Sequence, residues 1–310
     1  MRKSLKIGTR QSLLALWQST YIQSRLREQY PDCAVELKKI VTKGDRILDV
    51  PLAKIGGKGL FTKEIETELL DGTIDLAVHS LKDMPTVLPE GLCLTVITER
   101  ADSGDAFVSN RYERFADLPQ NAVVGTSSLR RKGQLLAARP DLTIVDLRGN
   151  VDTRLRKLDE GQMDAVILAA AGLQRLGYGE RIREILPVSL CIPAVGQGAL
   201  AIECREDRHD IREMLAFLND EPTRQATDGE RAFLRLIEGG CQVPIGVRGV
   251  VENGQVSLTA VIGSVDGSRL IRDEISGPAA EAEQLGEVLG NRMLAAGGRE
   301  ILAEIMEETK

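Results

Sequence analysis

The chain has 310 residues, of which 43% are apolar and 28% are charged. This composition is typical of globular proteins and excludes wholesale disorder, and the length suffices for about two or three domains. The net charge of −6 and the aromatic content of 3% argue against nucleic acid as the main ligand, because nonspecific binding needs a cationic surface and single strands need stacking rings.

The sequence carries no pattern that indicates a membrane span, a signal peptide or a metal site. No apolar run reaches the ~18 residues of a spanning helix, so we expect a cytoplasmic protein. The cysteines form no CxxC pair and have no histidine at metal-ligand spacing, which indicates neither a disulfide framework nor zinc. They stand at Cys33, Cys93, Cys191, Cys204 and Cys241.

The first elements in chain order alternate between strand and helix. Strands are predicted at 4–10, 35–41 and 74–78, and helices at 12–30 and 62–71. This alternation is typical of an α/β sheet of the parallel type.

Short segments of this first region recur later in the same order. Residues 7–12, 43–45 and 71–75 correspond to residues 124–128, 148–150 and 160–164. A glycine after a strand marks many turns, so one match alone would indicate no more than a turn. Three ordered matches favour a duplication, and we expect two α/β lobes of similar topology facing each other across a cleft.

A third region begins near residue 220. It contains an amphipathic helix at 225–240, then strands at 245–251, 256–263 and 268–276, and a last helix at 279–296. The strands are separated by Asn253-Gly254 and Asp266-Gly267, dipeptides typical of tight hairpins. The pattern predicts a small α+β domain with a three-stranded antiparallel sheet.

Cationic residues gather at predicted strand ends: Arg10, Lys54, Lys58, Lys82, Arg130, Arg131, Arg148 and Arg154. Strand carboxyl ends line the ligand crevice of open α/β sheets, and guanidinium groups suit carboxylates or phosphates. Arg130 and Arg131 fall in the first turn of a helix capped by Ser127 or Ser128, where cations oppose the helix dipole, so we expect a negative group between them. The alternative is a set of solvated surface charges.

Two further residues could carry chemistry. Asp83 follows an apolar strand beside Lys82, where a carboxylate could stabilise a cation or move a proton, although it could equally cap a turn. Cys241 follows Gly239-Gly240 on a loop that could expose a reactive thiol, although an unpaired cysteine is often a small buried apolar group.

The longest motifs resemble porphobilinogen deaminases, also called hydroxymethylbilane synthases, over essentially the whole chain. They are IGTRQSLLAL, KGDRILDVPLAKIGGKGLFTKEIE, DLAVHSLKDMPT, VGTSSLRR, LRGNVDTRL, PAVGQGALAIECR and ERAFLRLIEGGCQVPIG. The resemblance implies two lobes shaped like type II periplasmic binding proteins and a third domain. Domain 1 is expected at 3–98 and 198–217, domain 2 at 99–197 and domain 3 at 218–310.

The resemblance also implies an activity. The family carries a dipyrromethane cofactor, joined by a thioether to the cysteine that corresponds to Cys241. This primer receives four porphobilinogen molecules head to tail with loss of ammonia, and water then releases hydroxymethylbilane. We therefore expect a monomeric transferase of tetrapyrrole and haem biosynthesis, with porphobilinogen as its partner and with no nucleic acid, membrane or metal involved.

Family roles are carried over by motif position. The resemblance implies that Asp83 is catalytic and that Lys82, Ser128, Arg130 and Arg131 bind the cofactor. Residues implied to bind substrate carboxylates are Arg10, Ser12, Arg148, Arg154 and Arg175. Residues implied to belong to a mobile active-site loop are Lys54, Lys58 and Phe61.

Two other functions compete with this one. A two-lobed protein could bind or sense an anionic ligand without catalysis, because a fold alone does not imply chemistry. A thiol hydrolase or acyltransferase using Cys241 would need a histidine base, for which His79 is the plausible candidate.

Overall fold

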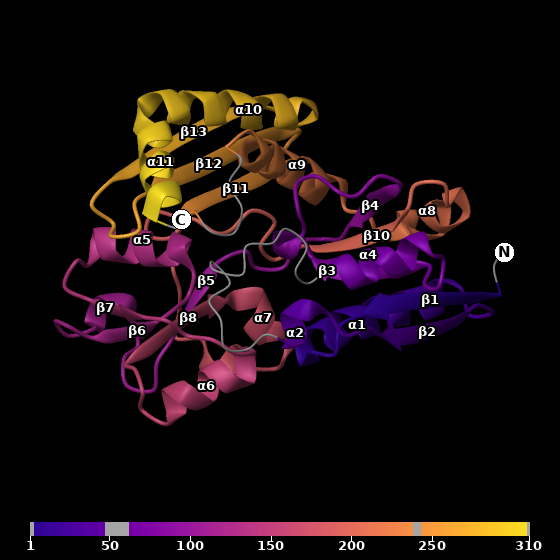
Figure 1. Cartoon of the computed structure of the whole chain (residues 1–310), viewed down its shortest axis with the longest axis horizontal. Coiled ribbons are helices and arrows are strands. Elements are labelled where there is room, and N and C mark those ends of the chain that lie inside the picture. Colours follow the sequence, from indigo (N-terminus) through magenta and orange to yellow (C-terminus); the bar gives the residue numbers. More distant parts are fainter. Residues whose placement is uncertain (1–2, 47–61, 238–242, 309–310) are drawn as a thin grey trace. The chain divides into compact units, whose positions relative to one another are not determined.

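The computed structural model describes residues 3–46, 62–237 and 243–308, so Lys54, Lys58, Phe61 and Cys241 lie outside the described residues. The chain divides into two compact units, which are described separately. Unit 1 comprises Met1–Arg100 and Ala199–Arg224, and unit 2 comprises Ala101–Gly198 and Gln225–Lys310. Figure 1 shows the elements along the chain.

Unit 1 is built on a five-stranded sheet of order β2-β1-β3-β10-β4. Its strands are β1 (Ser4–Thr9), β2 (Ala34–Lys39), β3 (Leu76–Ser80), β4 (Leu92–Ile97) and β10 (Leu200–Arg205). Its helices are α1 (Leu13–Gln29), α2 (Lys43–Arg46), α4 (Lys63–Leu70) and α8 (His209–Leu215), with short 3₁₀ turns η1 (Leu81–Asp83) and η4 (Ala216–Leu218). Helix α1 is confirmed, with Ser12 as N-cap and Tyr30 as C-cap just before Pro31.

Unit 2 contains a second five-stranded sheet, of order β7-β6-β8-β5-β9. Its strands are β5 (Asp105–Val108), β6 (Val123–Gly125), β7 (Thr143–Val145), β8 (Ala165–Ala169) and β9 (Glu184–Ile185). Its helices are α5 (Leu129–Ala138), α6 (Val151–Asp159) and α7 (Ala170–Arg175), with 3₁₀ turns η2 (Phe115–Asp117) and η3 (Gly179–Arg181).

The two sheets share one arrangement of strand order and direction, as expected for a duplication, although the fourth strand of the order comes last in the chain in unit 1 and first in unit 2. In each sheet the second strand of this order pairs in parallel with both of its neighbours, β1 with β2 and β3, and β6 with β7 and β8. The fourth strand, β10 or β5, is antiparallel to both of its neighbours. The strands predicted at 4–10, 35–41 and 74–78 are parallel as expected, and the antiparallel strands, β10 and β5, were not among the predicted strands. Neither β10 nor β5 is joined to its sheet neighbours by a strand–helix–strand crossover, the connection that parallel pairing requires.

The last part of unit 2 is the predicted three-stranded antiparallel sheet, of order β11-β12-β13. Its strands are β11 (Ile245–Glu252), β12 (Gln255–Gly263) and β13 (Leu270–Pro278). The turn between β11 and β12 has positive φ at Asn253 (51°) and Gly254 (75°), as the predicted tight hairpin requires. Helices α9 (Glu221–Leu236), α10 (Ala282–Met293) and α11 (Arg299–Glu308) accompany this sheet, with η5 (Ala279–Glu281) and η6 (Leu294–Gly298).

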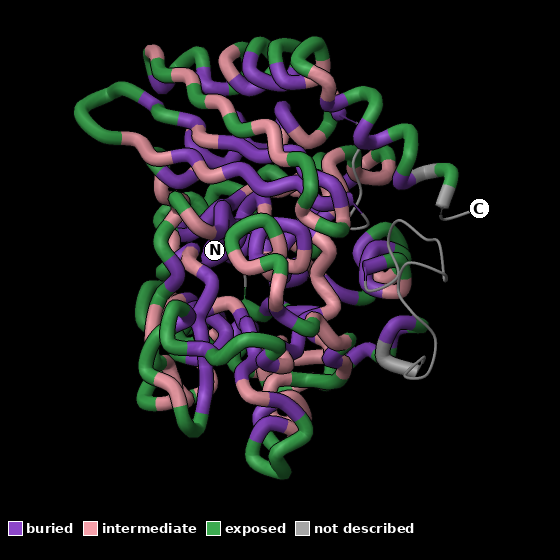
Figure 2. The backbone as a smooth tube through the Cα atoms, turned by 90° about the vertical axis from the view of Figure 1, so that its left-hand side faces the viewer, coloured by how far each residue is buried: buried purple, intermediate pink, exposed green. Residues whose placement is uncertain are grey.

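Alternating burial accounts for strands of the three-stranded sheet, whereas β5, β8 and β10 are buried along almost their whole length. In β12, Val256, Leu258, Ala260 and Ile262 are buried and contribute to one core with Phe233 of α9, while the residues between them face away from that core. Figure 2 shows buried, intermediate and exposed positions along the backbone. Among the described residues, no helix combines the length and the apolar character needed to cross a membrane.

Candidate functional site

In unit 1 the predicted site residues follow two neighbouring parallel strands. Arg10 and Ser12 come after β1, and Lys82 and Asp83 come after β3, which pairs with β1. Because parallel strands end at the same edge of a sheet, the fold brings these four residues to one edge. Asp83 is exposed at the end of η1, and Lys82 is half-buried.

Hydrogen bonds fix the orientation of this edge. The Ser12 hydroxyl accepts the backbone N–H of Ala15 at 3.3 Å and so caps α1. The Gln18 amide donates to the Ser80 hydroxyl at 2.8 Å. This bond links α1 directly to the end of β3, three residues before Asp83.

A buried pair of side chains, His79 and Glu203, lies on the neighbouring strands β3 and β10. His79 Nε2 lies 3.0 Å from Oε2 of Glu203, a fully buried residue of β10. His79 is itself only 7% exposed, so it is unsuited to serve as the accessible base that a thiol hydrolase would need. Sequence reasoning missed Glu203, because its partner lies more than a hundred residues away in the chain.

In unit 2 two helix N-termini meet at the ends of β6 and β7. Ser128 caps α5 by accepting the N–H of Arg131, and Asn150 caps α6 by accepting the N–H of Thr153. The Ser127 hydroxyl joins the two turns, since it donates to the Leu147 carbonyl at 2.9 Å and accepts the Leu147 N–H at 3.0 Å. Of the two N-cap candidates, Ser127 and Ser128, the N-cap of α5 is therefore Ser128. The adjacent N-termini of α5 and α6 therefore favour the binding of an anion.

Arg130 and Arg131 are buried, and both bind the carboxylate of Asp105. Arg130 donates from Nη1 to Oδ2 at 2.5 Å and from Nη2 to Oδ1 at 3.2 Å. Arg131 donates from Nε and Nη2 to Oδ1 at 2.9 and 2.7 Å. A negative group was expected between these two cations, and one such group is the carboxylate of Asp105.

Asp105 is ionised despite complete burial. Burial raises its pKa, but the charges and hydrogen bonds of Arg130 and Arg131 outweigh burial and hold the pKa far below its usual range. Gln197 adds a hydrogen bond to Oδ1 at 3.0 Å. One carboxylate faces two guanidinium groups, so the trio retains a net positive charge. No sequence motif pointed to Asp105, because it opens a strand outside any cationic motif.

Arg154 extends this positive region. Its pKa is lowered to about 10 by burial and by the charges of Arg131 and Arg148. Its Nε donates to the Gly149 carbonyl at 2.8 Å, and the charged neighbours that act on its pKa among the described residues are both cations. The structure therefore gathers Arg131, Arg148 and Arg154. Arg175, at the end of α7, donates to the Gly198 carbonyl at 2.7 Å.

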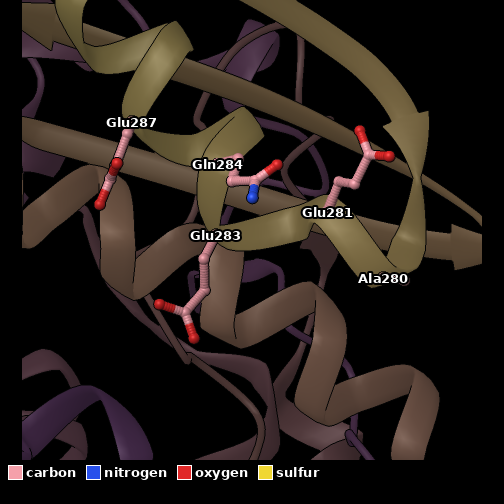
Figure 3. A pocket seen from close by; sticks show the side chains of 5 residues that line it. All are labelled: Ala280, Glu281, Glu283, Gln284 and Glu287. Atoms are coloured by element: carbon pink, nitrogen blue, oxygen red, sulfur yellow. The ribbon is translucent and has the colours of Figure 1, made fainter.

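A pocket elsewhere in unit 2 has the opposite character. Figure 3 shows that its lining comes from η5 and α10 and carries glutamate side chains. The lining residues are Ala280, Glu281, Glu283, Gln284 and Glu287. Because like charges repel, this pocket is unsuited to an anionic ligand.

Comparison with known proteins identifies the family. The family model described as "Porphobilinogen deaminase, dipyromethane cofactor binding domain" matches residues 5–213, and the C-terminal domain of the same family matches residues 225–295. The chain belongs to the porphobilinogen deaminase family. It is 56% identical to porphobilinogen deaminase of Geobacter metallireducens over 305 residues, 98% of this chain and 96% of that protein. It is 57% identical to that of Pelobacter propionicus, with 98% of each chain covered.

The chain is also similar to solved structures of low sequence identity. The methionine-binding protein MetQ matches with a TM-score of 0.45 and 15% identity, over 74% of this chain and 92% of that one. A periplasmic substrate-binding protein from Coxiella burnetii matches with a TM-score of 0.44 and 12% identity, over 71% of this chain and 93% of that one.

Membership of the porphobilinogen deaminase family confirms the main functional prediction. The chain is a transferase of tetrapyrrole biosynthesis that uses a dipyrromethane cofactor. The rival interpretation, a two-lobed binding protein without catalysis, is not favoured, because the family match extends over both lobes and the C-terminal domain.

Proposed function

We propose that this chain assembles hydroxymethylbilane from four porphobilinogen molecules on a dipyrromethane primer attached through a thioether to Cys241. The observation that carries the proposal is the cluster of Arg131, Arg148 and Arg154 where the N-termini of α5 and α6 meet. A fold that concentrates like charges in this way is stabilised by an anionic ligand.

The chemistry of the ligand matches this charge. Each porphobilinogen carries two carboxylates, so the primer and the growing chain are polyanions. The resemblance assigns Lys82, Ser128, Arg130 and Arg131 to cofactor binding. In unit 2 the excess of cations over Asp105 leaves charge for a ligand carboxylate. Arg10, Ser12, Arg148, Arg154 and Arg175 would bind the carboxylates of substrate and chain. The cofactor, when bound, supplies the pyrrole to which the first substrate is joined.

Asp83 is the proposed catalytic residue. Loss of ammonia leaves positive charge on the substrate, and an exposed carboxylate at a strand end can stabilise that charge. The same carboxylate can accept the proton that the pyrrole carbon loses once the new bond has formed.

Other parts of the proposal rest on the resemblance alone. Lys54, Lys58 and Phe61 are assigned to a loop over the active site, and Cys241 is assigned to the thioether. The three-domain division at 3–98 with 198–217, 99–197 and 218–310 belongs to the proposal too, as do a monomeric state, a cytoplasmic location and the lack of a nucleic-acid partner. Light scattering after size-exclusion chromatography tests the monomer.

The first experiment is the intact mass of the denatured protein. We expect an added mass equal to two linked pyrrole units in the wild type and none in Cys241→Ser. An unmodified wild type that stays unmodified after incubation with porphobilinogen would contradict the proposal.

The second experiment tests Asp83. Asp83→Asn removes the charge and keeps the shape, so we expect the fold and the cofactor mass to persist while most turnover is lost. Asp71→Asn, at another exposed carboxylate of unit 1, is the matched control and should keep its activity. Near-normal ammonia release by Asp83→Asn would refute the catalytic role.

A further inference from the structure

Two cysteines of unit 1 face each other across neighbouring strands. Cys204 of β10 is the direct partner of Cys93 of β4 in the antiparallel register. Such partners point to the same face of a sheet with Cα atoms about 4.5–5.5 Å apart, within the range of about 4.4–6.8 Å that a disulfide spans. The two thiols are hydrogen-bonded and unbridged.

Their surroundings give the two thiols different reactivity. The hydrogen bond from Cys204 lowers the pKa of Cys93 to about 7, assisted by Arg212, while burial, Glu206 and Glu203 act in the opposite direction. Cys204 is fully buried, and its pKa is raised by the hydrogen bond to Cys93 and by burial. Cys93 is partly accessible, so it is the thiol that can meet a reagent from solution as a thiolate.

This pair lies away from the proposed catalytic edge. Leu200, at the start of β10, pairs with Ser80 at the end of β3, close to Asp83. Cys204 lies near the other end of β10, and therefore at the opposite edge of the sheet. The pair has no part in the chemistry assigned to Asp83 and Cys241.

We propose that Cys93 and Cys204 form a reversible dithiol–disulfide site that reacts with low-molecular-weight disulfides. The Cys93 thiolate attacks one sulfur of the small disulfide, whose S–S bond breaks and releases one thiolate. Cys204 then loses its proton to solvent and attacks the Cys93 sulfur, releasing the second small thiolate. The two cysteines are oxidised to one disulfide, and the small disulfide is reduced to two thiols.

The first step prepares the second. While Cys93 is a thiolate, its hydrogen bond to Cys204 is the largest cause of the raised Cys204 pKa. Once Cys93 is in a mixed disulfide, this cause is gone, and Cys204 can ionise more easily. The Cys204 sulfur is then already in contact with the Cys93 sulfur that it attacks.

The resulting bridge would enclose most of the central chain. Residues 94–203 lie between the two cysteines, including the whole 101–198 segment of unit 2. A cross-link that closes a long loop restricts the unfolded chain and stabilises the folded one. Oxidation should therefore raise the thermal midpoint, and reduction should reverse the rise.

The test treats the full-length protein with glutathione disulfide under native conditions, blocks remaining thiols, and analyses tryptic peptides by mass spectrometry. We expect peptide 83–100 cross-linked to peptide 184–205 with loss of two hydrogens, and fragmentation should locate the bond at Cys204 rather than Cys191. In Cys204→Ala, Cys93 should instead accumulate as the mixed disulfide with glutathione. Cys33→Ala, at another buried cysteine of unit 1, is the matched control and should cross-link like the wild type.

Thermal unfolding provides a second measurement that does not depend on the buried variant. Oxidised wild type should unfold at a higher temperature than reduced wild type, and Cys93→Ser should show no such difference. The proposal is overturned if native protein stops at the mixed disulfide, if it does not react at Cys93, or if the cross-link persists in Cys204→Ala.

Discussion

Replacing Asp105 with asparagine tests the electrostatic account of unit 2. The side chain is fully buried and accepts four hydrogen bonds from Arg130 and Arg131, at 2.5 to 3.2 Å. Asparagine keeps the shape but leaves two buried guanidinium groups without a counter-charge. Breaking a buried ion pair in this way costs about 3–5 kcal/mol of unfolding free energy. At about 2–4 °C per kcal/mol for a domain of this size, the smaller value lowers the midpoint by about 6–12 °C.

The assay is thermal unfolding followed by circular dichroism at neutral pH, with Asp141→Asn as matched control. Asp141 also binds an arginine through two hydrogen bonds, from Arg139 at 2.8 and 2.7 Å, but this pair lies at the surface, where solvent screens the charges. The control should unfold close to the wild type. An Asp105→Asn midpoint equal to that of the control would refute the reasoning.

The pH dependence of the same variant gives an independent check. Because the folded pKa of Asp105 is depressed, its contribution to stability is complete above the unfolded value of about 3.9 and falls as pH drops below it. The stability difference between wild type and Asp105→Asn should therefore be constant from pH 5 to pH 7, by the same linkage, and shrink below about pH 4. A difference that grows on acidification would show that the carboxylate is not ionised in the folded state.

Three further outcomes are expected. Arg154→Gln should lower activity without lowering the unfolding temperature, because it removes repulsion from two neighbouring cations; a clear loss of stability would argue against that repulsion. Gly286→Ala should lower the free energy of unfolding by about 1–3 kcal/mol in denaturant titration, because the added Cβ would overlap the Gly229 carbonyl oxygen. Gly179→Ala is the control: its added Cβ meets no atom within contact distance, so the free energy of unfolding should stay unchanged. Burial raises the pKa of Glu66, so Glu66→Gln should stabilise the protein at pH 7, with the gain vanishing below about pH 4; an equal gain at both pH values would contradict this.

Local motifs predicted the elements and their duplication well. The recurrence of 7–12 as 124–128 marked two strands that occupy the same place in two sheets of the same strand order and direction. The hairpin at Asn253-Gly254 followed from turn chemistry, because both residues need positive φ. These features depend on a few adjacent residues, so they can be read without knowing the rest of the fold.

The features that the sequence did not reveal share one physical origin, the antiparallel fourth strand of each sheet. In unit 1 this strand is β10, which supplies buried Glu203 to His79, and in unit 2 it is β5, which supplies buried Asp105 to Arg130 and Arg131. Each acid lies 25 residues or more along the chain from its hydrogen-bonding partner, so no local spacing connects them. A buried carboxylate is tolerated only with such a partner. The local motifs therefore contained the basic side chain of each pair, and the acidic side chain could be assigned only once the strands were paired.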